Sequence, residues 1–480
     1  EMSYIHGITA TLGATQHAQP AASGTVPVYI GCAPVHLAAH PAPVNTPVLI
    51  RNYAEAVDML GMAWDFDKYD LAEAVYAHFG GRTAIGPIVA INVLDPDSAR
   101  ADEQQTQSLT LINGSGSFVD ADCILSTVAI ADKTQGVDFA VSFNYSTGRV
   151  TVTDLTGELS TPQEVSYSRV DTSKLTSAAV IGQTSDGTPP TGIKAIDLVY
   201  PRLGLVPSLA CALKWGCDKD VHTALVAAAA SASTKFPVLV VANLPCDGTT
   251  ATISDALSVK ASLDMDQDSV VVCWPLVSVG GRLLHAAARW ITRQMLIDNA
   301  NNGLPYETAS NKILDDVEGA YSSPGVEAVL TLDGANQLNA GGISTVLCWG
   351  GAWRLWGSHT AAYNADGEYD ARAVFASNMR MLYWLCNQIT LRYWDVIDQP
   401  MTRNNREAIV TSIQGWLDGL VSAGALCYAK CAVDTGADAL NTDLVRFTIH
   451  LSAAVTSVPP LQALSVQVSY TDAGLDLLFE

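Results

Sequence analysis

The chain has 480 residues, of which only 15% are charged, whereas about 25% is usual for a soluble domain. Its 26 Lys and Arg residues are outnumbered by 48 Asp and Glu residues, so the net charge is −22. This excess of acid argues against a nucleic-acid partner, because binding phosphates requires clustered basic residues. The length predicts about three domains, and the apolar content of 49% argues against disorder. We expect no membrane insertion, since Ser, Lys235 and Pro237 interrupt the most apolar stretch, 223–244.

The two ends of the sequence carry no charge. Asp, Glu, Lys and Arg are absent from Met2 to Ile50 and from Phe447 to Thr471. In both regions apolar residues alternate with polar ones, which predicts strands. The alternating residues are Ile8, Ala10 and Leu12 in the first strand and Leu464, Val466, Val468 and Tyr470 in the second. Because no charge prevents edge pairing, each strand is expected either to join a sheet of its own domain or to be donated to a neighbouring copy.

The first part of the chain is predicted to be mixed. Helices are expected at Tyr53–Leu60 and Leu71–Phe79, each followed by glycine, and a strand is expected at Ile88–Val93. From about residue 95 to 181, Ser, Thr and Gly separate short β-type segments. The clearest of these is a hairpin at Phe139–Thr153 that turns at Ser146-Thr147-Gly148. This region is predicted to be a small inserted β domain.

Helices and strands alternate from Gly192 to Trp349, which predicts a parallel sheet covered by helices. The expected helices are Thr223–Ala232, Ile253–Leu263 and Arg282–Ala300, and the expected strands are Pro237–Ala242, Ser269–Trp274 and Ile343–Leu347. The last third has long amphipathic helices followed by two strands, which indicates an α+β domain. Its helices are expected at Ala371–Ile397 and Asn404–Leu420, and its strands at Cys427–Val433 and Leu444–Leu451.

Familiar catalytic and metal-binding patterns are missing from the sequence. It has neither a Gly-x-x-x-x-Gly-Lys-Ser/Thr loop nor a Gly-x-Ser-x-Gly elbow, and Gly114-Ser115-Gly116-Ser117 is interpreted as a hairpin turn. His36 and His40 have no third ligand nearby, so packing or solvent contact is expected of them. The acidic run 315–318 is interpreted as a solvated surface. We therefore predict no active site, no metal and no cofactor.

Aromatic and sulfur-containing residues are assigned to packing. Trp349, Trp353 and Trp356 could form a ligand cage, but filling the core at the end of a sheet is the more common use of tryptophan. The ten cysteines contain no Cys-x-x-Cys pair and are expected to be buried thiols of a protein made in a reducing cytoplasm. Cys427 and Cys431 are expected to share one face of a strand and to pack there.

Ten short segments, in consistent order from about residue 2 to 470, carry a family resemblance. They are 47–61 (PVLIRNYAEAVDMLG), 92–96 (NVLDP), 192–208 (GIKAIDLVYPRLGLVPS), 273–275 (CWP), 305–312 (PYETASNK), 338–343 (LNAGGI), 353–357 (WRLWG), 393–401 (YWDVIDQPM), 416–420 (WLDGL) and 446–447 (RF). This series resembles the tail sheath proteins of contractile bacteriophages and related contractile injection machines. The sequence departs from the family pattern at His359, where Arg is frequent, and at 427–431, where a Gly-rich turn is frequent.

The resemblance implies a multidomain fold with α/β and α+β parts. Its centre is expected to be a subtilisin-like α/β core, with a small β domain inserted and with extended strand arms at both ends. The expected divisions are an N-terminal arm at 1–18, the first part of the core at 19–95, the inserted β domain at 96–185, the subtilisin-like domain at 186–360, a tube-facing α+β domain at 361–460 and a C-terminal arm at 461–480.

The resemblance also implies a structural subunit rather than an enzyme. Sheath subunits of this family form hexameric rings stacked around an inner tail tube, and they contract to drive the tube through the target cell envelope. The expected partners are other sheath subunits, the tube protein, and the baseplate and tail terminator proteins at the ends. The expected location is the tail sheath of a virion that is assembled in the bacterial cytoplasm.

In this family the terminal arms add strands to sheets in neighbouring subunits. The resemblance therefore assigns strand donation to the seven alternating residues of the two charge-free ends. The acceptor strands are expected to include Val433, Phe447, Ile449 and Leu451. Arg403 and Arg406 are candidates to meet acidic groups on the tube, although an exposed salt bridge at the helix end is an equal alternative.

Two other classes of protein remain open at this stage. A static shell or surface-layer protein can also exchange strands, and only contraction distinguishes a sheath from it. A hydrolase on an α/β core would require a nucleophile with a positioned histidine and acid, and no residue set in the sequence stands out for these roles.

Overall fold

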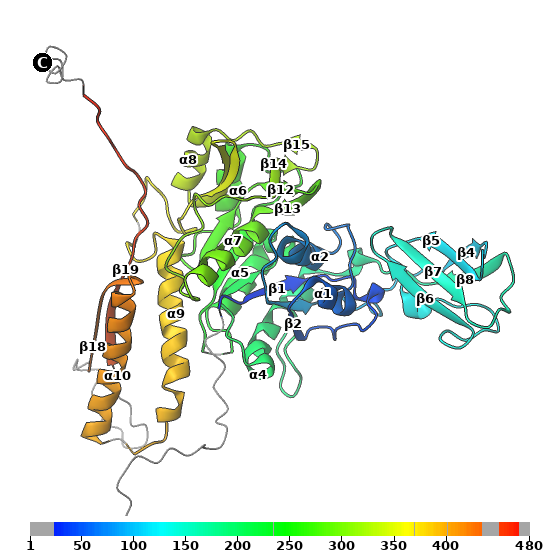
Figure 1. Ribbon diagram of the computed structural model, residues 1–480, viewed down its shortest axis with the longest axis horizontal. Coiled ribbons are helices and arrows are strands. Elements are labelled where there is room, and N and C mark those ends of the chain that lie inside the picture. Colours follow the sequence, from blue (N-terminus) through cyan, green and yellow to red (C-terminus); the bar gives the residue numbers. More distant parts are fainter. Residues whose placement is uncertain (1–23, 234, 369, 401, 434–450, 470–480) are drawn as a thin grey trace, which may run out of the picture.

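The computed structural model describes residues 24–233, 235–368, 370–400, 402–433 and 451–469. Figure 1 shows a central α/β body, a β module that projects from one side of it, and two long helices with a β-hairpin on the other side. None of the helices in these ranges is both long and apolar enough to cross a membrane. The predicted mixed α/β and α+β architecture is confirmed at this level.

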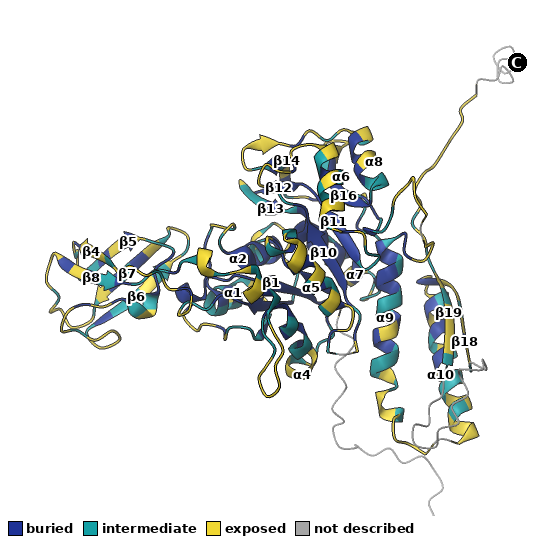
Figure 2. Cartoon of the chain, turned by 180° about the vertical axis from the view of Figure 1, so that it is seen from behind, coloured by how far each residue is buried: buried dark blue, intermediate teal, exposed yellow. Residues whose placement is uncertain are grey.

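An eight-stranded sheet forms the centre of the body, in the order β17-β16-β11-β10-β9-β1-β3-β2. The inner strands are parallel, and the edge strands β17 and β2 are antiparallel to their neighbours. The strands are β1 (Pro27–Gly31), β2 (Pro47–Ile50), β3 (Ile88–Asn92), β9 (Leu209–Cys211), β10 (Leu239–Asn243), β11 (Val270–Cys273), β16 (Ile343–Trp349) and β17 (Ala352–Trp356). Every residue of β1, β3, β10 and β11 is buried (Figure 2), as expected for parallel strands covered on both faces. The predicted parallel sheet is confirmed.

Helices surround this sheet. They are α1 (Tyr53–Leu60), α2 (Asp70–Val75), α3 (Ser177–Ile181), α4 (Val199–Leu203), α5 (Lys219–Ala229), α6 (Ile253–Ser262), α7 (Ala286–Ala300) and α8 (Leu332–Ala340). Most of them lie directly on its strands, whereas α3 packs on α5 and α6 packs on α8. Side-chain caps define where several of them start: Asp218 accepts from the first N–H groups of α5, and Thr252 forms a capping box with Asp255 in α6. The predicted helix at 71–79 is split, because α2 continues as a π-helical turn at Tyr76–Gly80.

The helix predicted at Arg282–Ala300 starts four residues later than expected. Arg282–His285 instead forms strand β13, which pairs with β12 (Leu276–Val279). Gly280 and Gly281 make the intervening turn with φ of 57° and 72°, a conformation that favours glycine. β14 (Val317–Ser323) and β15 (Val326–Glu327) complete this smaller sheet. Pairing with β12 overrides the helical pattern of these four residues.

The projecting β module has a hydrophobic core of its own. Its strands are β4 (Gln105–Leu109), β5 (Ser115–Val119), β6 (Phe139–Asn144), β7 (Arg149–Asp154) and β8 (Gln163–Tyr167). The core includes Phe118, Phe139, Val150, Val152 and Val165. The hairpin predicted at 139–153 is confirmed as β6 and β7. The module joins the body through a hydrogen bond from Trp64 Nε1 to the carbonyl of Tyr145 (2.8 Å) and an ion pair between Lys68 and Asp122 (2.7 Å).

The C-terminal part consists of two long helices and a hairpin. These are α9 (Ala376–Arg392), α10 (Arg403–Ser422), β18 (Leu426–Val433) and β19 (Leu451–Ser457). β18 and β19 pair antiparallel, and side chains from both pack with the helices around Met381, Ile413 and Leu417. The described second strand overlaps the predicted range 444–451 only at Leu451, and 444–450 lie outside the described residues.

The acidic run 315–318 is a solvated surface at Asp315 and Glu318, which are exposed as expected, but the interpretation made from the sequence is wrong for Asp316. Asp316 forms an ion pair with Arg289 of α7, and both side chains are largely buried. Glu318 accepts hydrogen bonds from the N–H of Gly281 (3.1 Å) and from Ser278 Oγ (3.3 Å). The partner arginine lies more than 20 residues away in the sequence, so spacing alone does not show the pair.

The predicted burial of the tryptophan group is wrong for Trp349. This side chain is exposed beside the two-residue turn between β16 and β17, where Gly350 and Gly351 have φ of 64° and 78°. Trp353 and Trp356 are half-buried, and Trp356 Nε1 donates to Asn336 Oδ1 at 3.0 Å. The three rings therefore do not fill the core together.

Burial is also wrong for part of the cysteine set. All ten cysteines are free thiols, but Cys348, Cys386 and Cys427 are exposed. Both Cys427 and Cys431 belong to β18. Cys431 is buried as predicted, whereas Cys427 faces solvent. The pairing of β18 with β19 shifts register between Leu426 and Tyr428, and this bulge removes the face relation that strict alternation predicts.

Candidate subunit interface

The segment after β19 is apolar and unpaired. Residues 458–469 form no strand with any described part of the chain, and Figure 1 shows this red segment running away from the body. Leu461, Leu464, Val466 and Val468 are 79%, 79%, 71% and 91% exposed. The predicted strand is therefore not paired with any described part of its own chain, and Tyr470 lies outside the described residues.

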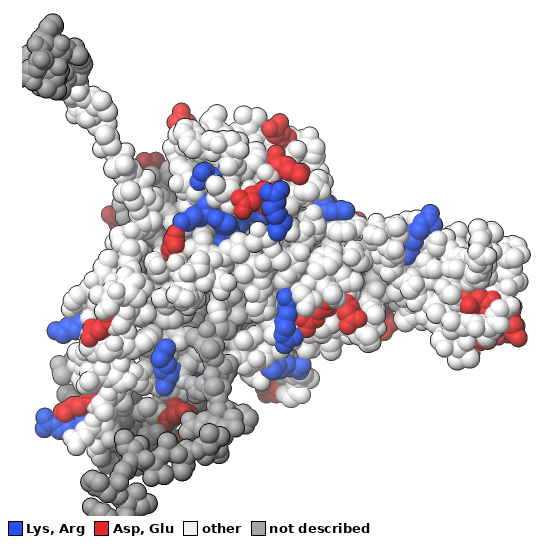
Figure 3. Space-filling view, in the orientation of Figure 1, with Lys and Arg blue, Asp and Glu red and all other residues white. Residues whose placement is uncertain are grey.

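Exposing these side chains is unfavourable for an isolated molecule. Fully burying one Val or Leu side chain contributes about 1.5–3 kcal/mol, so four of them represent a substantial binding free energy if a partner covers them. The segment also has no charge that would oppose pairing with another strand (Figure 3). Continuous exposed apolar surface of this kind is typical of interaction sites.

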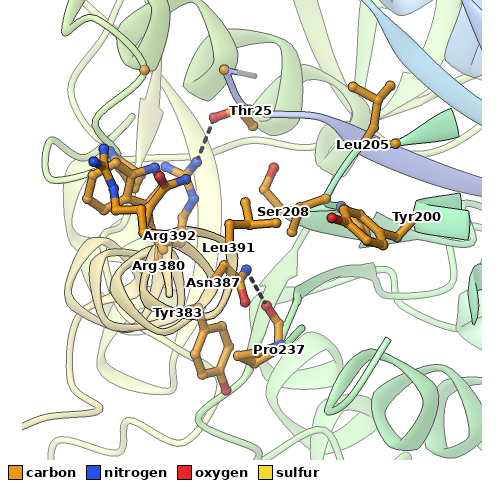
Figure 4. A pocket seen from close by; sticks show the side chains of 18 of the residues that line it. Thr25, Tyr200, Leu205, Ser208, Pro237, Arg380, Tyr383, Asn387, Leu391 and Arg392 are labelled. Atoms are coloured by element: carbon orange, nitrogen blue, oxygen red, sulfur yellow. Dashed lines mark hydrogen bonds between the residues drawn. The ribbon is translucent and has the colours of Figure 1, made fainter. Parts of the chain in front are cut away.

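The other predicted donor residues cannot be placed. Ile8, Ala10 and Leu12 lie outside the described residues, which begin at Gly24. The chain just after this point is anchored firmly, because the Thr25 hydroxyl donates to Asp298 and accepts from Arg380 Nη2 at 3.2 Å (Figure 4). Asp298 and Arg380 form a buried bidentate ion pair between α7 and α9. Gln294 Nε2 donates to the same carboxylate at 2.8 Å.

A groove lies next to this anchor, between α9 and the loop before β9. It has a volume of about 360 Å³, and its walls include Tyr200, Pro207 and Trp384. Asn387 of α9 donates to the carbonyl of Pro237 at 3.2 Å and thereby joins the helix to the start of β10 (Figure 4). These contacts fix the direction of α9 relative to the central sheet.

The expected acceptor strands are only partly described. Val433 and Leu451 are directly opposite each other at one end of the β18–β19 pair. Phe447 and Ile449 lie outside the described residues. Leu451 and Val455 face the helices, whereas Ala453 and Ala454 are exposed. This sheet has two strands among the described residues, so it has edges at which a further strand can pair.

The two arginines at the start of α10 differ in their surroundings. Arg403 Nε donates to Glu407 Oε1 at 2.8 Å, and the two side chains are 83% and 56% exposed. This is the local salt bridge that the sequence offered as the alternative to a tube contact. Arg406 is half-buried, and its Nε has no hydrogen-bond acceptor among the described residues.

The carboxyl ends of the parallel strands hold a buried titratable group that sequence reasoning missed. Glu73 of α2 accepts from both the N–H (2.5 Å) and Nδ1 (2.8 Å) of His285. Desolvation is the largest single influence and lowers the pKa of His285, but the charge of Glu73, its hydrogen bond and the charges of Asp70 and Asp67 together outweigh it, so the pKa is raised. Nearby, burial raises the pKa of the Asp70 carboxyl to about 7. The two residues of the pair are more than 200 positions apart, so only the fold brings them together.

These groups do not form a hydrolytic site. Burial raises the pKa of the Cys246 thiol to about 12 and raises that of Cys217 even further, so neither is available as a thiolate nucleophile. Gly114 lies in a turn closed by backbone hydrogen bonds between Ile112 and Ser115, as predicted. Among the described residues, no three side chains of His, Cys, Asp or Glu are arranged to hold a metal ion.

The two histidines singled out in the sequence have structural contacts. His36 is buried and bonded through Nε2 to the carbonyl of Ala121 at 2.9 Å, and burial lowers its pKa to about 4. His40 pairs with Asp58 at the surface (2.8 Å). His359, at a departure from the family pattern, stacks on Tyr363 with ring centroids 3.8 Å apart. Each of these three histidine side chains therefore has a packing or surface contact that explains its position.

Comparison with known proteins finds a relative in sequence and several solved structures with the same fold. No family model matches the sequence. The tail sheath protein of Burkholderia phage BcepMu is 24% identical over 495 aligned positions, which cover 98% of each chain. A chain in the cryo-EM structure of the anti-feeding prophage baseplate has the same fold, with a TM-score of 0.56, 13% identity and coverage of 97% of this chain and 100% of that one. A chain in the sheath complex of an extracellular contractile injection system in its contracted state gives a TM-score of 0.54, with 11% identity and coverage of 97% and 99%.

The similarity extends over nearly the whole chain in both sequence and fold. The proteins that share this length and fold come from sheath and baseplate assemblies, and none of these three is named as an enzyme. The family resemblance seen in the ten short segments is confirmed, and a hydrolase is no longer an alternative. Over nearly its whole length the chain is similar in sequence to a tail sheath protein, and it shares the fold of chains from contractile assemblies.

Proposed function

We propose that this chain is the subunit of a contractile tail sheath that polymerises as stacked hexameric rings around an inner tail tube. The observation that carries the proposal is the exposed, uncharged segment at 461–468, which lies beyond a hairpin with open edges. Each subunit thus offers both a strand and a place to receive one. Donation of terminal strands between copies joins the rings into a continuous mesh.

The exchanged strands allow the subunits to rotate without separating. Main-chain hydrogen bonds hold two copies together wherever the bodies lie, provided that flexible connections flank the shared strand. Pro459 and Pro460 separate β19 from the exposed segment, and Pro20, Gly24 and Pro27 lie after the predicted N-terminal strand. Contraction then exchanges one packing of the subunit bodies for another of lower free energy, and no nucleotide is required.

The parts of the subunit take different positions in this arrangement. The parallel sheet with its helices is the subtilisin-like core, to which the first part at 19–95 contributes β1, β2 and β3 and the domain at 186–360 contributes the other strands. The inserted β domain at 96–185 projects away from the polymer. The α+β domain at 361–460 faces the tube, and Arg406 is the better candidate for a tube contact because Arg403 is already paired with Glu407. The arms at 1–18 and 461–480 contact neighbouring subunits, while baseplate and terminator proteins contact the ends of the sheath.

This arrangement belongs to the tail of a virion or of a related injection machine, assembled in the bacterial cytoplasm. Deleting residues 461–480 or residues 2–12 tests the part played by the arms. Each variant should be a folded, soluble monomer with an unchanged circular dichroism spectrum, and neither should form tubes in electron micrographs. Normal tubes from both variants would contradict strand donation. Tubes of one constant diameter and ring spacing under all conditions would instead favour a static shell.

A further inference from the structure

The groove between α9 and the loop before β9 contains a buried amide without a partner. Gln388 of α9 lines the groove and is 7% exposed, yet its side chain makes no hydrogen bond with the described part of the chain. The Oδ1 atom of the neighbouring Asn387 is also buried and lacks a donor there, although its Nδ2 is bonded to the carbonyl of Pro237 (Figure 4). Buried polar groups are nearly always hydrogen-bonded, so these two amides indicate that a further segment supplies their partners.

One face of α9 forms a wall of this groove. The residues of the helix that line it recur every three or four positions and therefore form a single stripe. They are Arg380, Tyr383, Trp384, Asn387, Gln388 and Leu391. At 1.5 Å per residue, this stripe is about 16 Å long. Figure 4 shows Tyr200 and Leu205 across from the helix, on the opposite wall. The groove thus has the elongated form that an extended peptide segment requires.

The walls of the groove are aromatic, and they favour an uncharged occupant. Tyr200 of α4 and Trp394, which follows α9, are 37% and 58% exposed. Arg380 is already neutralised by its buried ion pair, and the other charged lining residues, Arg392 and Asp395, are exposed at the end of α9. A segment with small, uncharged side chains can therefore pack between the rings without removing an ion from water.

The described chain begins in this groove. Gly24 and Thr25 are part of its wall, and the Thr25 hydroxyl is anchored to Asp298 and Arg380 at one end of the stripe. The residues before Gly24 must therefore leave from the groove or from its mouth. The preceding segment, 18–23 (AQPAAS), carries no charge and consists mainly of alanine and proline. Fully extended, a segment of this length spans about 20 Å, which is enough to follow the whole stripe.

We propose that residues 18–23 of the same chain lie in this groove, extended along α9 from Arg380 towards Leu391, with their main chain bonded to Gln388. A glutamine amide both donates and accepts, so it can pair with a C=O and an N–H of an extended segment. The site lies within one subunit, so the proposal does not rest on the exchange of strands. The N-terminal arm then leaves the subunit at the far end of α9, and its free connection is limited to 13–17, which begins with glycine.

Hydrogen exchange of the full chain tests the proposal. The amides of residues 19 and 21–23 should exchange about tenfold more slowly than in a synthetic peptide of residues 13–27, because the groove binds and covers them. Gln388→Ala removes the bonding amide and should accelerate their exchange about fivefold, while the amides of α9 keep their protection. Cys386→Ala is the matched control, because Cys386 is exposed on α9 and does not line the groove. It should leave the exchange of these amides unchanged.

Two results of this experiment would overturn the proposal. One is exchange of the four amides at the peptide rate in the wild type, and the other is equal protection in the wild type and in Gln388→Ala. A photoreactive amino acid at position 21 of the full chain provides an independent measurement. Crosslinks to α9 or Tyr200 of the same chain support the proposal. Crosslinks to another subunit, recognised by mixing isotopically labelled and unlabelled chains, contradict it.

The deletion of residues 2–12 separates this proposal from strand donation. The variant lacks the predicted N-terminal strand but keeps 18–23, so protection of these amides should persist even though tubes no longer form. Loss of the protection in this variant would show that the donated strand, and not the groove, holds the segment. Tubes that form normally would instead contradict donation of the N-terminal strand, and the persisting protection would still support the groove.

Discussion

Asp70 is a fully buried carboxyl group at the start of α2. Burial is the main cause that raises its pKa to about 7, while a hydrogen bond from the N–H of Cys32 partly opposes the shift. A raised carboxyl pKa means that the folded state binds more protons than the unfolded state between about pH 4 and pH 7. This residue therefore lowers the free energy of unfolding as the pH rises through that range.

The variant Asp70→Asn should remove this dependence on pH. Relative to wild type it should gain stability between pH 5 and pH 8, because asparagine can still accept from Cys32 and carries no charge to bury. Urea unfolding midpoints at the two pH values measure the difference. Asp154 is a useful contrast: backbone N–H groups, first that of Leu159, lower its pKa. Asp154→Asn should therefore be less stable than wild type by an amount that stays constant between pH 5 and pH 8, because this carboxyl is ionised in both the folded and the unfolded state throughout that range. A stability difference from wild type that changes with pH in the same way for both variants would contradict the explanation.

Asp298 neutralises Arg380 at the junction of α7 and α9. Both side chains are at most 3% exposed, and the Thr25 hydroxyl completes the network. Removing one partner of such a pair leaves a buried charge, which costs about 3–5 kcal/mol. We expect Asp298→Asn to lower the free energy of unfolding by about that amount in chemical denaturation. Arg403→Ala, which breaks an exposed pair, should change it by no more than about 1 kcal/mol, and similar losses in both variants would count against a special role for the buried pair.

Substitutions in the exposed C-terminal segment should impair assembly most directly. Lysine in place of Val466 and Val468 puts two charges on the face that is expected to pack against a neighbour, and desolvating them opposes strand pairing. The double variant should remain a soluble monomer in sedimentation experiments under conditions that polymerise the wild type. Lysine at Ser465 and Gln467 adds the same charge on the opposite face and should reduce assembly less. Equal loss from both variants would show that charge itself, and not the apolar face, determines assembly.

Elements with a local cause were predictable from the sequence. The helix at 53–60 is capped by Asn52 and ends at Gly61, and the continuous valines at 270–272 form a buried parallel strand. Elements determined by distant partners were not. Strand β13 exists because β12 lies beside it, and Asp316 is buried because Arg289 reaches it.

The candidate interface could be predicted in part for the same reason. The alternation of Leu464, Val466 and Val468 indicates a strand. The same alternation is expected whether that strand pairs within its own chain or with another molecule, so it does not identify the partner. The bonds from the Gln414 side chain of α10 to the carbonyl of Ala429 and the N–H of Cys431 in β18 were not predicted, because an isolated glutamine gives no signal until β18 lies beside it.

At the scale of the whole molecule, the β module and the body have separate hydrophobic cores. Phe139→Ala removes a fully buried ring from the module, which costs about 3–5 kcal/mol locally. Hydrogen exchange should show loss of protection for amides in 105–167, while β10 and β11 in the body keep theirs. Tubes should still form, because neither arm lies in the module. Loss of protection that extends to β10 would show that the two cores unfold as one unit.

The central claim is that subunits joined by exchanged strands change their packing without losing those strands. Helical reconstruction by cryo-EM of native particles before and after contraction tests it most directly. The account predicts two states that differ in diameter and ring spacing, with residues 464–468 of one subunit paired to the hairpin of another in both. A single state, or a C-terminal segment that pairs within its own subunit, would contradict it.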